Sequence, residues 1–373
     1  MRIRGRHYRS GEQVELTCAD GVVTSVGPPT LEPVEAEAGW IAPGFCDLQV
    51  NGYRGISFNS LGNADELRVI VDACAAHGVS AFLPTLITDA QESLIHAVRT
   101  LADLLAADAR TATRVPGFHV EGPAISSEDG PRGAHPRAHV RPPDWEQFLR
   151  LQEAAQGRIR LVTLAPELPG AILFIERLVA AGVLVAVGHT NAGPEQIHAA
   201  VAAGARLSTH LANGCSDMLP RHHNVVWEQA AEDRLHASLI ADGRHLPPAV
   251  LKSLIRIKTP ERCMLVSDLS PLAGLPPGRY PAMGGEFEVA DDGAVRIPGT
   301  SRFAGSSAFL DLCVSHAAHC GGIALAEAID MASARPREML GLPRSAVEVG
   351  GVMDFVLFDF DDGRIQVQKI ITA

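Results

Sequence analysis

The chain has 373 residues, of which 46% are hydrophobic and 20% charged, as in compact globular proteins and unlike disordered or fibrous ones. Acidic residues outnumber basic ones 43 to 32, for a net charge of −11, and no Lys/Arg block occurs, which argues against a nucleic-acid partner. No apolar run reaches the roughly 18 residues that span a bilayer, and the N-terminus lacks the apolar core of a signal peptide, so we expect a cytoplasmic protein without membrane contact. Seven irregularly spaced cysteines indicate reduced thiols rather than a disulfide framework.

Both ends of the chain have the pattern of short strands joined by turns. Residues 14–26 and 352–371 each contain two apolar runs separated by a turn that ends in Asp-Gly. No linker long or polar enough to separate independent domains follows either end. We therefore predict that residues 1–40 and 346–373 together build a small β-sandwich domain, with residues 41–345 inserted between them.

The middle of the chain alternates short apolar runs with Ala/Leu-rich stretches at helical spacing, which is typical of repeated βα units. Eight alternations predict an α/β fold with a closed (β/α)8 TIM-like barrel. A doubly wound open sheet is the alternative, although no GxGxxG motif follows the first run. After the last run the pattern loosens through a Gly/Pro-rich stretch at residues 271–299. The eight runs are residues 41–50, 81–83, 117–120, 161–164, 184–187, 206–209, 237–240 and 263–266.

Ionisable residues stand at the ends of six of the eight predicted strands, where such barrels gather their chemistry. A buried ionisable group costs several kcal/mol unless it is paired or bound to a metal. A single reason for the ionisable residues at all six strand ends, such as a common binding site, is therefore favoured. Glu121, His189 and His210 are the candidate ligands of a divalent ion such as Zn²⁺, with one position left open for water. Asp268 either caps the turn after the last strand or, beside a metal, carries a proton.

A histidine at a strand end is more often a satisfied buried group than a metal ligand. That interpretation holds for His119, which shares a face with Glu121, whereas His189 and His210 on adjacent strands favour the metal. The segment Phe303-Ala304-Gly305-Ser306-Ser307 opens a predicted helix, so its backbone N–H groups could bind an anion, although capping alone also explains the serines.

Six segments in chain order resemble the amidohydrolase superfamily and, more narrowly, its N-acetylglucosamine-6-phosphate deacetylase family. The resemblance implies a metal-dependent amide hydrolase that releases acetate from an N-acetyl amino sugar phosphate, and a homodimer. The small β domain also suits that family. The segments are residues 42–52, 119–123, 187–192, 208–213, 241–245 and 267–268.

The resemblance also implies residue roles. Gln49 and Asn51 stand where many amidohydrolases carry a His-x-His pair for a second metal, so we predict one metal per chain, with zinc first and iron, manganese or cobalt as alternatives. Asp268 would carry the proton and His135 would face the substrate carbonyl. The substrate-binding residues predicted in this way are Gln49, Asn51, Asn213, Gly214, Arg221, His245 and Ser306.

Two departures from the family pattern concern the phosphate. The family has an Arg in a Gly-Arg-Glu-Pro-Gly-like stretch that reaches the phosphate across a dimer, but residues 219–224 are Leu-Pro-Arg-His-His-Asn, and Asn213-Gly214-Cys215 replaces Asn-Ala-Met. Amide hydrolysis is therefore better supported than the phosphate on the substrate. Two alternatives stay open: an amidohydrolase acting on an unphosphorylated N-acyl sugar, an N-acyl amino acid or a cyclic amide, and an inactive barrel that binds a sugar.

Overall fold

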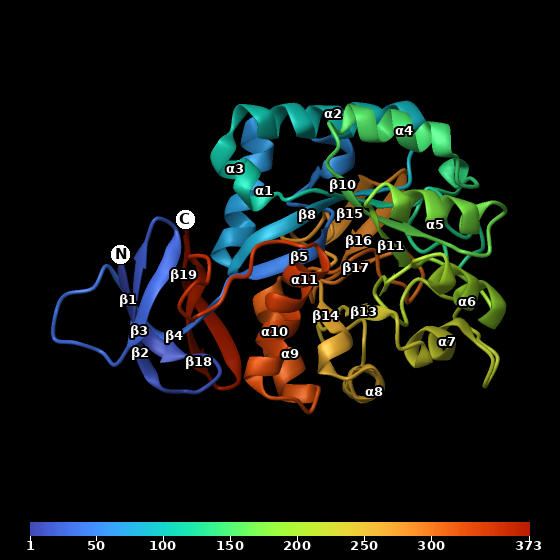
Figure 1. Cartoon of the computed structure of the whole chain (residues 1–373). Helices are drawn as coiled ribbons and strands as arrows, with labels where there is room; N and C mark the ends of the chain where they lie inside the picture. The colour runs from blue at the N-terminus through green and yellow to red at the C-terminus, as the bar shows by residue number, and fades with distance from the viewer.

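An eight-stranded parallel sheet forms the centre of the computed structural model, which describes residues 1–373 (Figure 1). The first strand is joined to the segment that follows the last one, because Val50 pairs with Leu269 and the Asn51 N–H donates to the Leu269 carbonyl at 2.9 Å. The predicted α/β barrel is thereby confirmed. The strands are β5 (Phe45–Val50), β8 (Val79–Ile87), β9 (Phe118–Glu121), β10 (Ile159–Leu164), β11 (Leu184–Val187), β12 (Leu207–Ser208), β13 (His236–Leu239) and β14 (Cys263–Leu265).

Amphipathic helices cover the outside of this sheet. In the second helix Leu94, Val98, Leu101 and Leu105 recur every three or four residues and are all buried, each worth about 1.5–3 kcal/mol of transfer free energy. Asn63 caps the first helix by accepting from two backbone N–H groups. None of the helices combines the length and apolar character needed to cross a bilayer. The helices are α1 (Ala64–Ala76), α2 (Gln91–Ala107), α3 (Ala109–Arg114), α4 (Trp145–Ala154), α5 (Ala171–Ala180), α6 (Pro194–Ala202), α7 (Val225–Ala231), α8 (Pro248–Lys258), α9 (Leu310–Cys320), α10 (Leu325–Ala332) and α11 (Ala334–Met339), with 3-10 turns at Phe58–Ser60, Arg137–His139 and Pro260–Arg262.

Both chain termini contribute to a second, six-stranded sheet, which lies to one side of the barrel (Figure 1). The strands follow the order β19-β18-β4-β1-β2-β3, and the sheet folds on itself so that Leu16 of β2 and Phe355 of β18 share one core. The predicted β domain from both ends is therefore confirmed, while its division from the barrel at residues 40 and 345 stays a proposal. The strands are β1 (Arg2–His7), β2 (Gln13–Ala19), β3 (Val22–Gly27), β4 (Ala36–Pro43), β18 (Asp354–Asp361) and β19 (Arg364–Thr372).

A buried ion pair joins the two parts. The guanidinium of Arg337, in α11, contacts the carboxylate of Asp354 at the start of β18 and donates to the Ser80 hydroxyl of β8 at 3.2 Å. Both charged side chains are buried, so neither can be removed without leaving the other uncompensated.

The Gly/Pro-rich stretch holds more regular structure than its sequence indicates. Strands β15 (Gly278–Ala282), β16 (Gly285–Val289) and β17 (Val295–Arg296) form an antiparallel sheet, and a two-residue pair, β6 (Gly52–Tyr53) and β7 (Ile56–Ser57), follows β5. The three-stranded sheet has its own small core, which includes Phe287 and Val295. This sheet matters for the candidate site because Met283 and residues 301–305, on either side of β16 and β17, line the cavity described below.

Candidate active site

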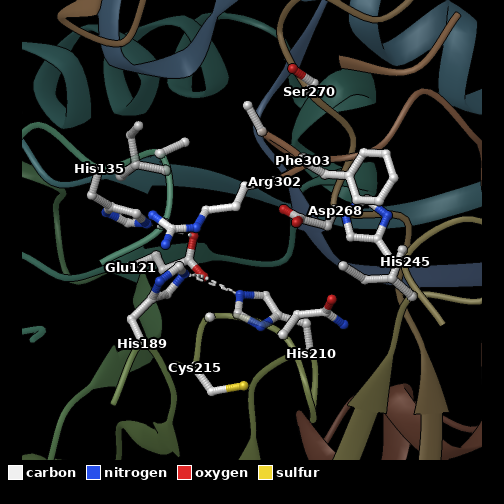
Figure 2. A pocket seen from close by; sticks show the side chains of 18 of the residues that line it. Glu121, His135, His189, His210, Cys215, His245, Asp268, Ser270, Arg302 and Phe303 are labelled. Carbon is white, nitrogen blue, oxygen red and sulfur yellow. Dashed lines mark hydrogen bonds and ion pairs between the residues drawn. The ribbon is translucent and has the colours of Figure 1, made fainter. Parts of the chain in front are cut away.

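Three buried side chains converge at the carboxyl end of the barrel. Glu121 ends β9, and His189 and His210 each follow their strands, β11 and β12, by two residues. Glu121 Oε1 lies 3.2 Å from His189 Nε2 and 3.1 Å from His210 Nε2, and the two nitrogens are 3.1 Å apart (Figure 2). Tetrahedral ligands about 2.0–2.1 Å from Zn²⁺ are separated by about 3.3 Å, so this spacing fits one divalent ion.

The hydrogen bonds around the imidazoles also fit a cation. His189 Nδ1 donates to the Pro131 carbonyl at 2.8 Å, which leaves the lone pair on Nε2. His210 Nδ1 is buried without a protein partner, so no carbonyl or carboxylate of the chain holds its proton. Despite its burial, the surrounding imidazoles hold the pKa of Glu121 well below its usual range, so the carboxylate is charged. Two imidazole nitrogens and one carboxylate oxygen together form a set of ligand atoms suited to zinc and similar ions.

The backbone that presents these groups is strained. His189, His210 and Asp268 have φ angles of 50°, 32° and 48°, in the left-handed region that costs residues other than glycine about 1–3 kcal/mol each. A Cβ on the neighbouring Gly214, whose φ is 58°, would lie 3.0 Å from both His189 Nδ1 and His210 Cε1, so a side chain there would push the two imidazoles out of place. These kinks turn the side chains at the ends of different strands toward one point.

Gln49 separates Glu121 from Asp268. Its Nε2 donates to Glu121 Oε1 at 2.9 Å and to Asp268 Oδ1 at 3.0 Å, and Asn51 Nδ2 donates to the same Asp268 oxygen at 2.8 Å. Burial, followed by the charge of Glu121, raises the pKa of Asp268 to about 6. A carboxyl group with this pKa can both accept and release a proton near neutral pH.

Two further histidines, His135 and His245, face the cavity, and the Nδ1 atom of each ring contacts a neighbouring residue. His135 Nδ1 lies 2.8 Å from the Thr88 hydroxyl and 3.3 Å from the Thr88 N–H. When Nδ1 accepts from both groups, the ring proton is on Nε2, 3.6 Å from Glu121 Oε2. Burial lowers the pKa of His135 to about 4, so the ring is neutral. His245 Nδ1 lies 2.7 Å from Asp242 Oδ2. Each ring therefore presents Nε2 to the cavity in a fixed orientation.

His119 lies behind the cluster rather than in the cavity. Its Nε2 is 2.8 Å from the Thr163 hydroxyl, and Nδ1 is 3.2 Å from the Leu48 carbonyl. Burial lowers its pKa to about 4. The sequence-based interpretation of His119 as a supporting residue agrees with these contacts.

The metal-ligand candidates, Asp268, His135 and His245 line one cavity of about 310 Å³. Gln49 and Ser306 do not line it: Gln49 joins the two carboxylates, and Ser306 donates its hydroxyl to the Ser267 carbonyl at 2.6 Å, which supports the turn at Asp268. Arg221 lies on the exposed surface and does not line it either. The predicted site residues that do line it are Asn51, Glu121, His135, His189, His210, Asn213, Gly214, His245 and Asp268.

The sequence analysis missed several residues that line this cavity, among them Asp217, Met283 and Arg302. Figure 2 shows Arg302 among the side chains that line it. For Arg302 a signal existed, because it directly precedes the Phe-Ala-Gly-Ser-Ser segment singled out as a possible anion site. No sequence signal pointed to Met283, which lies in the turn between β15 and β16 within the Gly/Pro-rich stretch.

The amidohydrolase family model matches residues 40–372. The chain belongs to the amidohydrolase family. It is 36% identical over 335 residues to N-acetylglucosamine-6-phosphate deacetylase of Homo sapiens, covering 86% of this chain and 79% of the relative. It is 32% identical over 332 residues to N-acetylgalactosamine-6-phosphate deacetylase of Escherichia coli O157:H7, covering 88% and 85%.

Among solved structures, this amidohydrolase resembles a mutant N-acetyl-D-glucosamine-6-phosphate deacetylase from Mycobacterium smegmatis in complex with N-acetyl-D-glucosamine-6-phosphate. The TM-score is 0.89 and the identity 30%, and the match covers 99% of this chain and 97% of the other. The likeness thus extends over the barrel and the terminal sheet together.

Proposed function

We propose that this amidohydrolase hydrolyses N-acetylglucosamine-6-phosphate to glucosamine-6-phosphate and acetate. The observation that carries the proposal is the convergence of Glu121, His189 and His210 opposite Asp268, with Gln49 between the two carboxylates. The curated relatives with this name, and the substrate in the related structure from M. smegmatis, support the choice of substrate.

When bound by Glu121, His189 and His210, a divalent ion supplies Lewis-acid polarisation of the acetamide carbonyl and lowers the pKa of water. Asp268 accepts a proton from the water whose oxygen bonds to the carbonyl carbon. It then delivers that proton to the nitrogen as the C–N bond breaks, so the amine and acetic acid leave, the acid ionises to acetate in water, and the carboxylate of Asp268 is restored.

His135 is the donor to the carbonyl oxygen in this proposal. The Thr88 N–H occupies its Nδ1, so the neutral ring offers an Nε2 proton to the cavity, where negative charge develops on that oxygen. His245, held by Asp242, contacts the sugar through Nε2.

Other predicted assignments stay proposals. Asn51, Asn213 and Gly214 line the cavity and are available to the sugar. Gln49 and Ser306 act by positioning Asp268, and Arg221 would reach a phosphate only from a second copy of the chain. Zinc as the bound ion, a homodimer and a cytoplasmic location belong to the same proposal.

The test combines metal content with acetate release. We expect about one divalent ion per chain, and faster acetate release from N-acetylglucosamine-6-phosphate than from N-acetylglucosamine. Metal-loaded protein that releases acetate from neither sugar would contradict the deacetylase proposal, and purified active protein without metal would contradict the ligand assignment.

N-acetylgalactosamine-6-phosphate is the second candidate substrate. It differs from the first only in the configuration at C4, and two bacterial relatives, at 32% and 35% identity, carry its name. The ratio of kcat/KM for the two epimers decides between them, and only a preference for the glucose epimer keeps the first proposal.

A further inference from the structure

Apart from the ion proposed at Glu121, His189 and His210, the cavity offers little positive charge to an anionic substrate. Its lining includes three carboxylates, those of Glu121, Asp217 and Asp268, but only one permanently charged cation, Arg302, and no lysine. A phosphate-bearing substrate must find its counter-charge here or from outside the chain.

The guanidinium of Arg302 uses only some of its donors to bind Asp217. Its Nε and Nη2 both donate to Asp217 Oδ2, at 3.0 and 2.5 Å, while Nη1 has no protein partner. The Asp217 side chain is 61% exposed and that of Arg302 31% exposed, so this is a rim ion pair of the weak, screened kind. Asp217 can therefore turn into water and leave the guanidinium fork free.

The segment that carries Arg302 also reaches the sugar side of the cavity. The Phe303 ring lies against His245, with ring centroids 4.6 Å apart, and Figure 2 shows both beside Asp268. An anion on Arg302 would thus be held by the segment that packs against a proposed sugar contact.

We propose that Arg302 binds the 6-phosphate of the substrate from within the same chain, in competition with Asp217. This inference rests on the proposed function and names the residue that selects phosphorylated substrates. A dianionic phosphate accepts two parallel N–H donors from a guanidinium and outcompetes a single carboxylate oxygen. Arg221, which lies outside the cavity, is not required for this arrangement.

The experiment compares phosphate preference, defined as kcat/KM for N-acetylglucosamine-6-phosphate divided by kcat/KM for N-acetylglucosamine, in metal-loaded variants. Arg302→Met should lower this preference at least tenfold through a higher KM for the phosphorylated sugar. Asp217→Asn should raise it severalfold, because the competing carboxylate is gone. Arg279→Met is the matched control: Arg279, in β15, is exposed and pairs with Glu286, so its loss removes one charge outside the cavity and leaves the preference unchanged.

Since the preference is a ratio, a general loss of active enzyme cancels. An unchanged phosphate preference in Arg302→Met would overturn the inference. If the phosphate preference is lost in Arg221→Ala instead, the inference is also overturned, and the phosphate is assigned to Arg221 of a second copy of the chain. Calorimetric titration with glucosamine-6-phosphate separates this inference from the proposed function. Binding that weakens tenfold in Arg302→Met supports the inference even if the wild type releases no acetate, whereas equal binding overturns it.

Discussion

Replacing Asp268 by asparagine should affect turnover and stability in opposite directions. The substitution keeps the shape of the side chain and leaves Oδ1 available to Gln49 and Asn51, but it removes the proton acceptor. General acid–base groups contribute about 10²–10⁴-fold, so we expect kcat to fall by that factor, or by about 2.7–5.5 kcal/mol in activation free energy. Metal content should stay at the wild-type level.

The stability of the metal-free protein should rise. Because burial and Glu121 raise the pKa of Asp268 from its usual value near 3.8 to about 6, ionisation of Asp268 opposes folding. This cost is absent below about pH 4, grows between about pH 4 and 6, and is complete above that, at up to about 3 kcal/mol. Asp268→Asn should therefore match the wild type near pH 4 and exceed it at pH 8.

Urea denaturation of chelator-treated protein at both pH values measures this difference, and acetate release measures turnover. Asp242→Asn is the control of opposite sign, since the hydrogen bond from His245 lowers the pKa of Asp242 despite its burial. The ionised Asp242 stabilises the folded state at pH values above the usual pKa of an aspartate, so Asp242→Asn should be less stable than the wild type at pH 8. Turnover near the wild-type level in Asp268→Asn would refute the proton-carrier role, and equal stability at pH 8 would refute the argument from buried charge.

Three further substitutions test the metal site and the junction between the two parts of the molecule. His189→Ala should weaken metal binding by more than about 100-fold and abolish activity, because it removes a ligand rather than a supporting contact; metal retained after dialysis would contradict the assignment. Gly214→Ala should weaken metal binding about tenfold with a loss of only about 1–2 kcal/mol in unfolding free energy, since the added Cβ meets His189 and His210; equal metal affinity in a competition titration would count against it. Arg337→Met should cost about 3–5 kcal/mol by leaving Asp354 buried and unpaired, and urea unfolding should show part of this recovered by adding Asp354→Asn; a single-variant loss below about 1 kcal/mol would speak against a buried pair.

Local sequence pattern was sufficient for the barrel and insufficient for the sheet beside its mouth. Most strands of the barrel are short and predominantly apolar, such as residues 184–187 for β11, because both faces of a parallel sheet are buried. Strands β15 to β17 are at most five residues long and lie among glycines and prolines, and β15 contains no fully buried residue. The folding of these strands into a sheet depends on a hydrophobic core that they share with Leu272 and Ala304, which lie outside the strands.

The sequence by itself determined that Glu121, His189, His210 and Asp268 would meet. Successive parallel strands of a barrel place their carboxyl ends on one face, so residues at those ends converge whatever the loops do. Only the tertiary structure decided what stands between and around them. Gln49 separates the two carboxylates, and Arg302 enters the cavity to meet Asp217, 85 positions away in the chain. Those contacts depend on the path of long loops, which neither helical nor strand periodicity encodes.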